Sequence, residues 1–266
     1  MQEEPNYNSI HVAQVTVRNT PVYLVGDLHG ETFKLIQKVK EMNIENSVFI
    51  FLGDLYLEHP ETAVKWFSEL DTCLAARDIK SFIIRGNHDN PFLWDHNNSL
   101  YNKFWSNFKS FTPIGSHTEL NINGNIGAII PGAISLNRTQ LTEGVNYWSD
   151  YDFPEAPYDM ENFGENRTHV DFIIGHSGPI YNGIFNDDNE YKVWADRFKE
   201  IDKQLEEDLD KEQKYFKEIL KRYRPRRWYC GHYHFSKSEK YVWDNWSDGA
   251  IINLRVVNKE ELVRIA

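Results

Sequence analysis

Five segments of this sequence share one pattern: an apolar run ends in a glycine, and a residue able to bind a metal ion follows at once. The segments are VYLVGDLHG, FIFLGDLYL, FIIRGNHDN, FIIGHSGP and WYCGHYHF. The apolar, β-branched runs are typical of buried strands, and the glycine permits a sharp turn after each run. Sites in open α/β sheets form just beyond the carboxyl ends of strands, so we expect these five ends to converge. The residues that follow the glycines are Asp27, Asp54, Asn87, His176 and His232.

The first half of the chain alternates strand and helix patterns. Strands are predicted at 21–25, 47–52 and 81–84, and helices at 32–42 and 61–76. Such alternation indicates βαβ units and a fold of the α/β (α+β) class. The last strands of the chain are predicted after Tyr241, in YVWDNW, AIINLRVV and LVRIA.

The chain is interpreted as one domain over residues 1–266, with two segments of distinct character. The segment at about 91–165 is rich in asparagine and aromatic residues, and its NINGNIGAIIPGAISL stretch predicts a hairpin with an Asn-Gly turn. The segment at about 189–224 is predicted to be one long charged helix, whose charges form a solvated face rather than a partner-binding surface. The aromatic residues of the first segment either form a secondary core, which we favour, or line a groove that stacks on bases or rings. They include Trp94, Trp105, Tyr147, Trp148 and Tyr151.

An excess of acidic residues limits the partners that this chain can bind. Its 40 Asp and Glu against 29 Lys and Arg give a formal net charge of −11, which predicts no strong nucleic-acid patch. No apolar run approaches the ~20 residues needed to cross a bilayer, and the polar N-terminus is unlike a secretory signal. Two cysteines, Cys73 and Cys230, give neither a disulfide framework nor a zinc motif, so we expect a cytoplasmic protein. The sequence leaves the oligomeric state open.

The residue types in the five segments favour a metal site. Asp, Asn and His offer oxygen and nitrogen donors without thiolates, a set that suits Mn, Fe, Zn, Ni or Co. Asp27 and His29 are two residues apart, as are His232 and His234, so an extended backbone turns both members of each pair the same way. Alternatively, the first pair caps a helix, GNHD is a simple turn, and the second pair lies on a surface strand. All these alternatives must hold together for the metal site to be absent.

In their order along the chain, five motifs resemble those of the calcineurin-like metallophosphoesterase superfamily: GDLHG (26–30), GD (53–54), GNHD (86–89), GH (175–176) and GHYH (231–234). The resemblance covers most of the sequence. It implies a sandwich of two β-sheets flanked by helices and the hydrolysis of phosphate esters. It also implies two divalent metal ions as cofactors, with Mn²⁺ the first choice and Fe, Zn, Ni or Co as alternatives.

The resemblance implies two groups of metal ligands that share Asp54 as a bridge. The ligands of one ion would be Asp27, His29, Asp54 and His234. The ligands of the other would be Asp54, Asn87, His176 and His232. A water or hydroxide between the ions would attack in line, and His88 would act as general acid on the leaving oxygen. Asp89 would orient His88 or a neighbouring loop at the substrate site.

The motifs depart from the branches of the superfamily that they resemble. GDLHG and RGNHD are similar to those of serine/threonine phosphoprotein phosphatases, which continue the second motif with an Asp-Arg pair. Here Leu57 and Glu58 stand at those two positions, so the arginine that clamps the phosphate is missing. PGAISLNR (131–138) is similar to a segment of bacterial and phage metallophosphoesterases. Arg138 is therefore a candidate for the phosphate clamp, and Arg167 is a further one.

Three functions fit these observations. The first is a metal-dependent hydrolase of phosphoric esters, acting on a phosphorylated small molecule, a nucleotide or a phosphoprotein. The second is a phosphodiesterase that cleaves nucleotides or nucleic-acid ends. The third is a catalytically weak scaffold that binds other proteins, although no expected ligand is replaced in this sequence.

Overall fold

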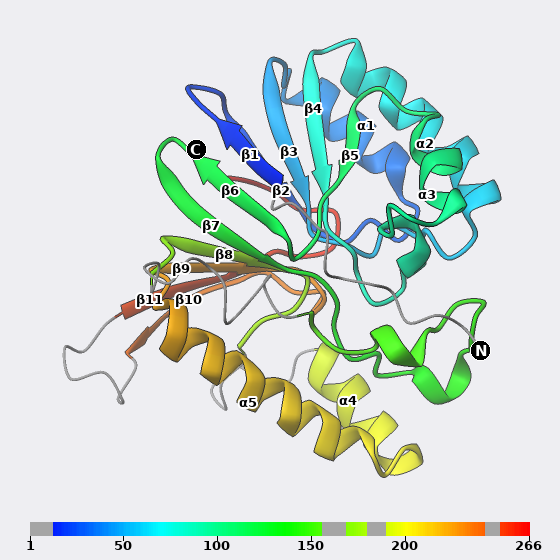
Figure 1. The fold of residues 1–266 in the computed structure, drawn as a ribbon, viewed down its shortest axis with the longest axis vertical. Coiled ribbons are helices and arrows are strands. Elements are labelled where there is room, and N and C mark those ends of the chain that lie inside the picture. Colours follow the sequence, from blue (N-terminus) through cyan, green and yellow to red (C-terminus); the bar gives the residue numbers. More distant parts are fainter. Residues whose placement is uncertain (1–12, 156–168, 180–189, 243–250) are drawn as a thin grey trace.

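The fold is a pair of mixed β-sheets packed face to face and flanked by helices, which confirms the expected fold class (Figure 1). The computed structural model describes residues 13–155, 169–179, 190–242 and 251–266. Helices α1, α2 and α3 cover the outer face of one sheet, and α4 and α5 cover the other. Within the described ranges, no helix is both long enough and apolar enough to cross a membrane.

The five-stranded sheet has the order β12-β2-β3-β4-β5. Strands β2 (Val22–Val25), β3 (Ser47–Phe51), β4 (Ile79–Ile83) and β5 (Phe111–Pro113) run parallel, and β12 (Leu262–Arg264) pairs antiparallel with β2. Every residue of β3 is buried, as expected for a parallel strand covered on both faces. The strands predicted at 21–25, 47–52 and 81–84 are thus confirmed within two residues of their ends.

Helices α1 (Thr32–Glu41), α2 (Pro60–Ala75) and α3 (Ser99–Trp105) cover this sheet. Helix α1 buries Leu35, Ile36 and Val39, which lie on one face at helical spacing. Helix α2 begins with proline, which costs no hydrogen bond at the first helical position. The two predicted helices therefore form within a residue of their expected bounds.

The seven-stranded sheet has the order β1-β6-β7-β8-β9-β11-β10. Its predicted hairpin joins β6 to β7 through Asn123 and Gly124, whose φ angles of 52° and 86° suit the tight turn that Asn-Gly favours. Strands β7, β8, β9 and β11 are mutually parallel neighbours. The bounds are β1 Ala13–Val17, β6 Thr118–Ile122, β7 Asn125–Ile130, β8 Phe172–Gly175, β9 Arg227–Cys230, β10 Lys237–Val242 and β11 Ile251–Val256.

The prediction of one long charged helix is wrong, because two helices occupy that segment. Helix α4 (Glu190–Ile201) ends at Asp202, whose carboxylate accepts a hydrogen bond from the Gln204 amide at 3.0 Å. Helix α5 (Leu205–Tyr223) then begins with three acidic residues, which the positive end of the helix dipole stabilises. The Asp202 carboxylate thus competes with helical hydrogen bonding for a backbone amide. The periodicity of hydrophobic residues does not reveal such a contact.

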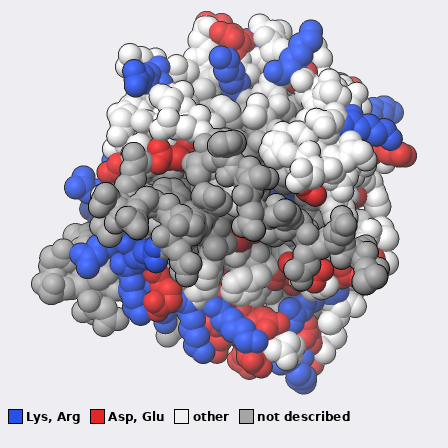
Figure 2. Space-filling view, in the orientation of Figure 1, with Lys and Arg blue, Asp and Glu red and all other residues white. Residues whose placement is uncertain are grey.

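The charges of helix α5 form a mixed, solvated face. Figure 2 shows Lys and Arg interspersed with Asp and Glu along the edge where α5 lies in Figure 1. Lys211 pairs with Glu207 and Asp208 at 3.0 and 3.2 Å, and Lys221 pairs with Glu218 at 2.6 Å. These pairs support the solvated-face interpretation, since neighbouring charges of opposite sign satisfy one another.

Most of the aromatic residues singled out in the 91–165 segment are used in packing. Trp94 and Trp105 pack in the core under α3, and their indole nitrogens donate to the carbonyls of Ile83 and Leu93 at 3.2 and 2.6 Å. Trp148 is 6 % exposed. The structure therefore favours a secondary core over a stacking groove for these residues. Residues 156–165 of the segment lie outside the described ranges.

The apolar layer between the sheets aligns the strand ends that carry the motifs. It includes Leu24 and Ile50 from the smaller sheet and Ile129 and Ile174 from the larger one, all at most 1 % exposed. Strands β2, β3 and β4 are parallel neighbours in one sheet, as are β8 and β9 in the other. Their carboxyl ends meet at one edge of the sandwich, where the five glycine motifs lie.

Candidate metal centre

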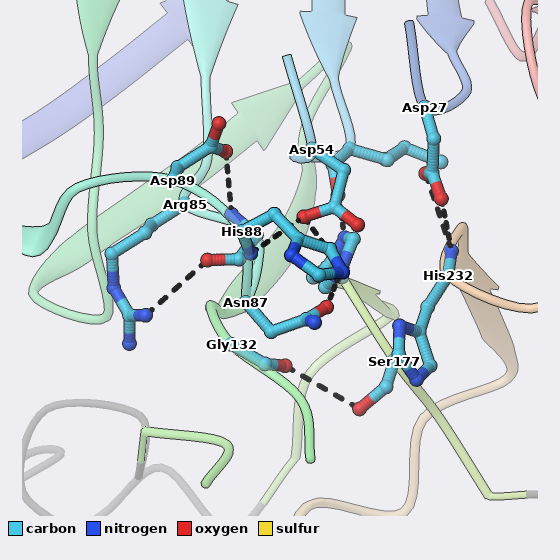
Figure 3. Close-up of polar contacts among 12 residues, drawn as sticks. Asp27, Asp54, Arg85, Asn87, His88, Asp89, Gly132, Ser177 and His232 are labelled. Carbon is cyan, nitrogen blue, oxygen red and sulfur yellow. Dashed lines mark hydrogen bonds and ion pairs between the residues drawn. The ribbon is translucent and has the colours of Figure 1, made fainter. Parts of the chain in front are cut away.

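The loops after β2, β3, β4, β8 and β9 bring the predicted ligands together (Figure 3). Two groups of three form, and within each group the candidate ligand atoms lie within 4.8 Å of one another. One group is Asp27, His29 and His234, and the other is Asp54, His176 and His232. These are the two groups in which the family resemblance placed the six residues.

Asp54 lies between the two groups. Its Oδ2 is 3.9 Å from Nε2 of His29, and its Oδ1 is 3.4 Å from Nε2 of His176. One carboxylate oxygen thus faces each group. Asn87 joins the second group, because its Oδ1 lies 2.8 Å from Nε2 of His176 while its amide nitrogen donates to Ser135 Oγ at 3.0 Å.

The glycine of one motif makes room for the carboxylate of another. A Cβ atom at Gly86 would lie 2.1 Å from Oδ1 of Asp54, and a Cβ atom at Gly231 would lie 2.3 Å from Oδ1 of Asp27. Any side chain at these positions would displace the carboxylate. The repeated strand-then-glycine pattern therefore reflects close backbone approach as well as turning.

Four of the candidate ligands have a left-handed backbone, which is uncommon for residues other than glycine. Their φ angles are 44° at His29, 50° at Asp54, 65° at His232 and 54° at His234. Such conformations persist where the surrounding structure enforces them, and they cluster at functional sites. These left-handed turns, rather than the extended backbone expected from the two-residue spacing, orient the four side chains toward one centre.

The donor set fits divalent metal ions. Nε2 of His232 is buried and has no hydrogen-bond partner among the described residues, which is costly for a polar atom unless it binds a ligand. Nε2 of His29 and Nε2 of His234 lie only 3.0 Å apart. Nδ1 of His176 donates to the Leu52 carbonyl at 2.6 Å, so Nε2 is the nitrogen that would bind an ion on releasing its proton. Imidazole nitrogens and carboxylate oxygens that converge in this way are typical of metal sites.

The electrostatics of the centre follow from burial and mutual contact. Burial alone would raise the pKa of Asp54, but His176, His88 and His29 hold it well below its ordinary value. Burial opposes the charge on His176, yet the Asp54 carboxylate raises its pKa to about 9. Burial and the nearby His176 lower the pKa of His232 well below its ordinary value, so that ring is held neutral and ready to bind an ion.

The first group shows the same two opposing effects. Burial lowers the pKa of His29, with Asp54 and Asp27 opposing. Burial also tends to lower the pKa of His234. The contact of its Nε2 with Oδ2 of Asp27, at 3.3 Å, outweighs burial and raises that pKa. A carboxylate next to each imidazole therefore balances the cost of burying charge.

His88 and Asp89 have different positions although they are adjacent. The His88 amide donates to Oδ1 of Asp54 at 3.0 Å, and the residue lines the pocket at the centre. Asp89 is 0 % exposed and accepts hydrogen bonds from the amides of Leu55, Leu57 and Gly86 at 3.0, 3.3 and 2.9 Å. Asp89 therefore ties the loop after β3 to the loop after β4, in line with the expectation that it orients a neighbouring loop, and it is too deeply buried to contact a substrate directly.

Arg138 does not occupy the position expected of a phosphate clamp. Its guanidinium contacts the carboxylates of Asp152, Asp202 and Asp208 at 3.6, 2.6 and 2.8 Å. These contacts join the segment after β7 to the helices α4 and α5. The expectation is thus corrected by three carboxylates that satisfy this cation away from the pocket. The second candidate, Arg167, lies outside the described residues.

A pocket of about 380 Å³ opens onto the metal centre. Six residues of the centre line it: His29, Asp54, Asn87, His88, His232 and His234. The rest of its lining includes Asn137 and Gln140 after β7 and Tyr191, Trp194 and Phe198 on α4. Sequence reasoning missed these lining residues as site residues, although the helical spacing of Tyr191, Trp194 and Phe198 could have indicated a shared face.

Comparisons with known proteins connect this chain to one family. A family model described as calcineurin-like phosphoesterase matches residues 20–236. No curated protein sequence matches the chain. Among solved structures, the chain is similar to a protein serine/threonine phosphatase from Saccharomyces cerevisiae described as similar to human phosphatase PP5. That match is 13% identical, covers 93% of this chain and 71% of the other, and has a TM-score of 0.35.

The family match spans all five motifs, including the whole of the fifth segment. It thus includes every residue of the two ligand groups as well as Asn87 and His88. The chain belongs to the calcineurin-like phosphoesterase family, whose members are dinuclear metal-dependent enzymes that hydrolyse phosphoesters.

Proposed function

We propose that this protein hydrolyses phosphoric esters with two divalent ions held at the carboxyl ends of its strands. One ion would be bound by Asp27, His29, Asp54 and His234, and the other by Asp54, Asn87, His176 and His232. The observation that carries the proposal is the position of Asp54, which turns one carboxylate oxygen toward each ligand group. Mixed oxygen and nitrogen donors favour Mn²⁺, with Fe, Zn, Ni and Co able to use the same set.

The residues of the pocket suit the two demands of ester hydrolysis. Bound ions acidify a water and neutralise the phosphate oxygens. His88 and Asp54 line the same pocket. The backbone amide of His88 donates to the Asp54 carboxylate, so the His88 imidazole is available to protonate the leaving oxygen. Asp89 holds the loop that carries His88 through three backbone hydrogen bonds.

The proposal is tested by metal analysis and a substrate panel. Purified protein should bind two ions per chain and hydrolyse aryl phosphate esters with at least one of Mn, Ni, Co, Zn and Mg. Asp54→Asn should lose both ions, because it weakens the shared ligand, whereas the exposed Asp150→Asn should keep both. Protein that binds no divalent ion and cleaves no ester would favour the protein-binding scaffold instead.

A further inference from the structure

We infer that the pocket beside the metal centre binds a planar ring, and that the substrate is a phosphodiester carrying a nucleoside. The ring would stack on Trp194 of α4, with the side-chain amides of Asn137 and Gln140 available to its polar edge. This inference rests on the proposed function and names its substrate class. It depends on the part of the pocket that the metal-binding motifs do not form.

Helix α4 presents an aromatic surface to the pocket. Tyr191 and Phe198 are 6 % and 3 % exposed, whereas Trp194, which lies between them, is 42 % exposed and still lines the pocket. The Trp194 ring stacks on Phe198, with centroids 5.6 Å apart and planes inclined by 16°. Phe198 and the guanidinium of Arg197, whose central carbon lies 5.4 Å from the centroid of the Trp194 ring, hold the indole in a fixed orientation, and only the exposed part of the ring is open to a ligand.

The aromatic surface is continuous with the metal centre. The Tyr191 ring contacts the rings of His232 and Tyr233 edge-on, at centroid distances of 5.5 and 4.8 Å. A ligand that reaches from the ions to Trp194 thus passes along aromatic rings. The volume of about 380 Å³ lies within the range of small-molecule sites.

The part of the pocket lining that comes from the segment after β7 is polar but uncharged. Asn137 and Gln140 lie beside Leu136 in the segment after β7, and Arg138 turns away to its three carboxylates. Neither side-chain amide donates to or accepts from another described residue. Side-chain amides both donate and accept hydrogen bonds, so they can pair with the polar edge of a base. Stacking on an aromatic ring is possible for every base, because every base has a flat π face.

The charge of the pocket favours a diester over a monoester. Its described lining contains no lysine or arginine, so only the bound ions would balance the charge of a phosphate. Partly buried Glu58 stands where related phosphatases have a clamping arginine, and it interacts electrostatically with His88. A monoester dianion would bring two negative charges into a described lining that has no side-chain cation, whereas a diester carries a single negative charge.

The reaction needs no other reactant. Water supplies the oxygen that bonds to phosphorus, and one of the two ester P–O bonds breaks. The departing oxygen takes a proton and leaves as an alcohol, while the product keeps the other ester group as a phosphomonoester. No electron transfer is involved.

The test compares two diesters with the same leaving group. The nucleoside diester is thymidine 5′-(p-nitrophenyl phosphate), and methyl p-nitrophenyl phosphate lacks the base. We expect the Mn²⁺-loaded protein to prefer the first in kcat/KM. Trp194→Leu should reduce that preference roughly tenfold or more, mainly through KM, because it removes the stacking surface. Trp194→Phe should restore most of the preference, and Trp66→Leu, at an exposed tryptophan of α2, should leave it unchanged.

A second measurement does not depend on catalysis. Saturation-transfer NMR on the metal-free protein should detect binding of free thymidine, and the signal should be lost in Trp194→Leu but not in Trp66→Leu. Melting temperatures of all variants establish that each is folded.

The outcomes separate this inference from the proposed function. A protein that hydrolyses both diesters with no preference, or whose preference survives Trp194→Leu, would overturn the inference and leave the proposed function standing. A protein that hydrolyses no ester but binds thymidine through Trp194 would overturn the proposed function and keep the ring-binding site.

Discussion

The backbone amide of His232 donates hydrogen bonds to both carboxylate oxygens of Asp27, at 3.2 and 2.9 Å, although 205 positions separate the two residues. Asp27 follows β2 in one sheet, and His232 follows β9 in the other. The contact therefore fixes the two sheets relative to each other at the metal centre. This contact requires glycine at position 231, since a Cβ atom on that residue would lie 2.3 Å from Oδ1 of Asp27.

Gly231→Ala should weaken metal binding and lower stability. The added methyl group would push Asp27 away from its ligand position, and overpacking of this kind costs about 1–3 kcal/mol. Metal content and the free energy of unfolding in urea measure the two effects. Gly115→Ala is the matched control, because its Cβ atom would meet nothing within 4 Å. Equal behaviour of the two variants would contradict this account of the glycine motifs.

His88→Ala should retain both metal ions but lose turnover. The bond from His88 to Asp54 comes from the backbone amide, so the substitution keeps it and removes only the imidazole. Loss of a general acid lowers kcat by about 10²–10⁴-fold, and most for esters with poor leaving groups. Steady-state kinetics over a series of leaving groups measures this, with the exposed His96→Ala as control. Loss of an ion in His88→Ala would show that the imidazole is a ligand.

Arg138→Gln should reduce stability without weakening phosphate binding. The guanidinium joins three carboxylates that are 4 %, 11 % and 21 % exposed, and the substitution leaves them without their cation. Breaking a fully buried ion pair costs about 3–5 kcal/mol, so about 2 kcal/mol is expected at this partly exposed site. Urea denaturation and competition by inorganic phosphate measure the two properties, with the exposed Arg18→Gln for comparison. Weaker phosphate competition at unchanged stability would restore Arg138 as the clamp.

Glu212 should make stability depend on pH between about 4.5 and 7. Burial in α5 raises the pKa of Glu212 to about 7, although the Ile134 amide and the Ser177 hydroxyl donate to it at 3.3 and 3.2 Å. In this window the folded state binds the proton that the unfolded state has released, so stability falls as pH rises. Above pH 7 the carboxyl is ionised in both states and the loss is complete.

Glu212→Gln isolates this contribution, because glutamine keeps the shape of the side chain and does not titrate. The difference in unfolding free energy between the natural protein and the variant should change by roughly 3 kcal/mol between pH 4.5 and 7. It should stay constant on either side of that window. Urea denaturation of both proteins at a series of pH values provides the measurement. A constant difference across the whole series would mean that Glu212 has an ordinary pKa.

Local patterns in the sequence were sufficient to predict the strands of the first half and the candidate ligands at their ends. Residues Ser47–Phe51 form a strand because a run of β-branched and aromatic residues fits a strand buried on both faces. Asp27, Asp54, Asn87, His176 and His232 could be singled out because each follows a glycine at a strand end. The carboxyl ends of parallel strands meet at one edge, so a one-dimensional pattern predicts a three-dimensional cluster.

The sequence determined the two sheets and the residues that gather at their edge, because strand patterns and glycine turns are encoded within a few neighbouring residues. Only the tertiary structure decided the partners of individual polar side chains. Arg138 lies on three aspartates, and Asp89 lies on three amides, through contacts between residues that are distant in sequence. The helical spacing of Tyr191, Trp194 and Phe198 indicates a shared face, but only the packing of α4 places that face at the pocket. These side-chain partners depend on which surfaces pack together in the folded chain. The packing energy comes from contacts between segments, so no single segment of the sequence encodes it.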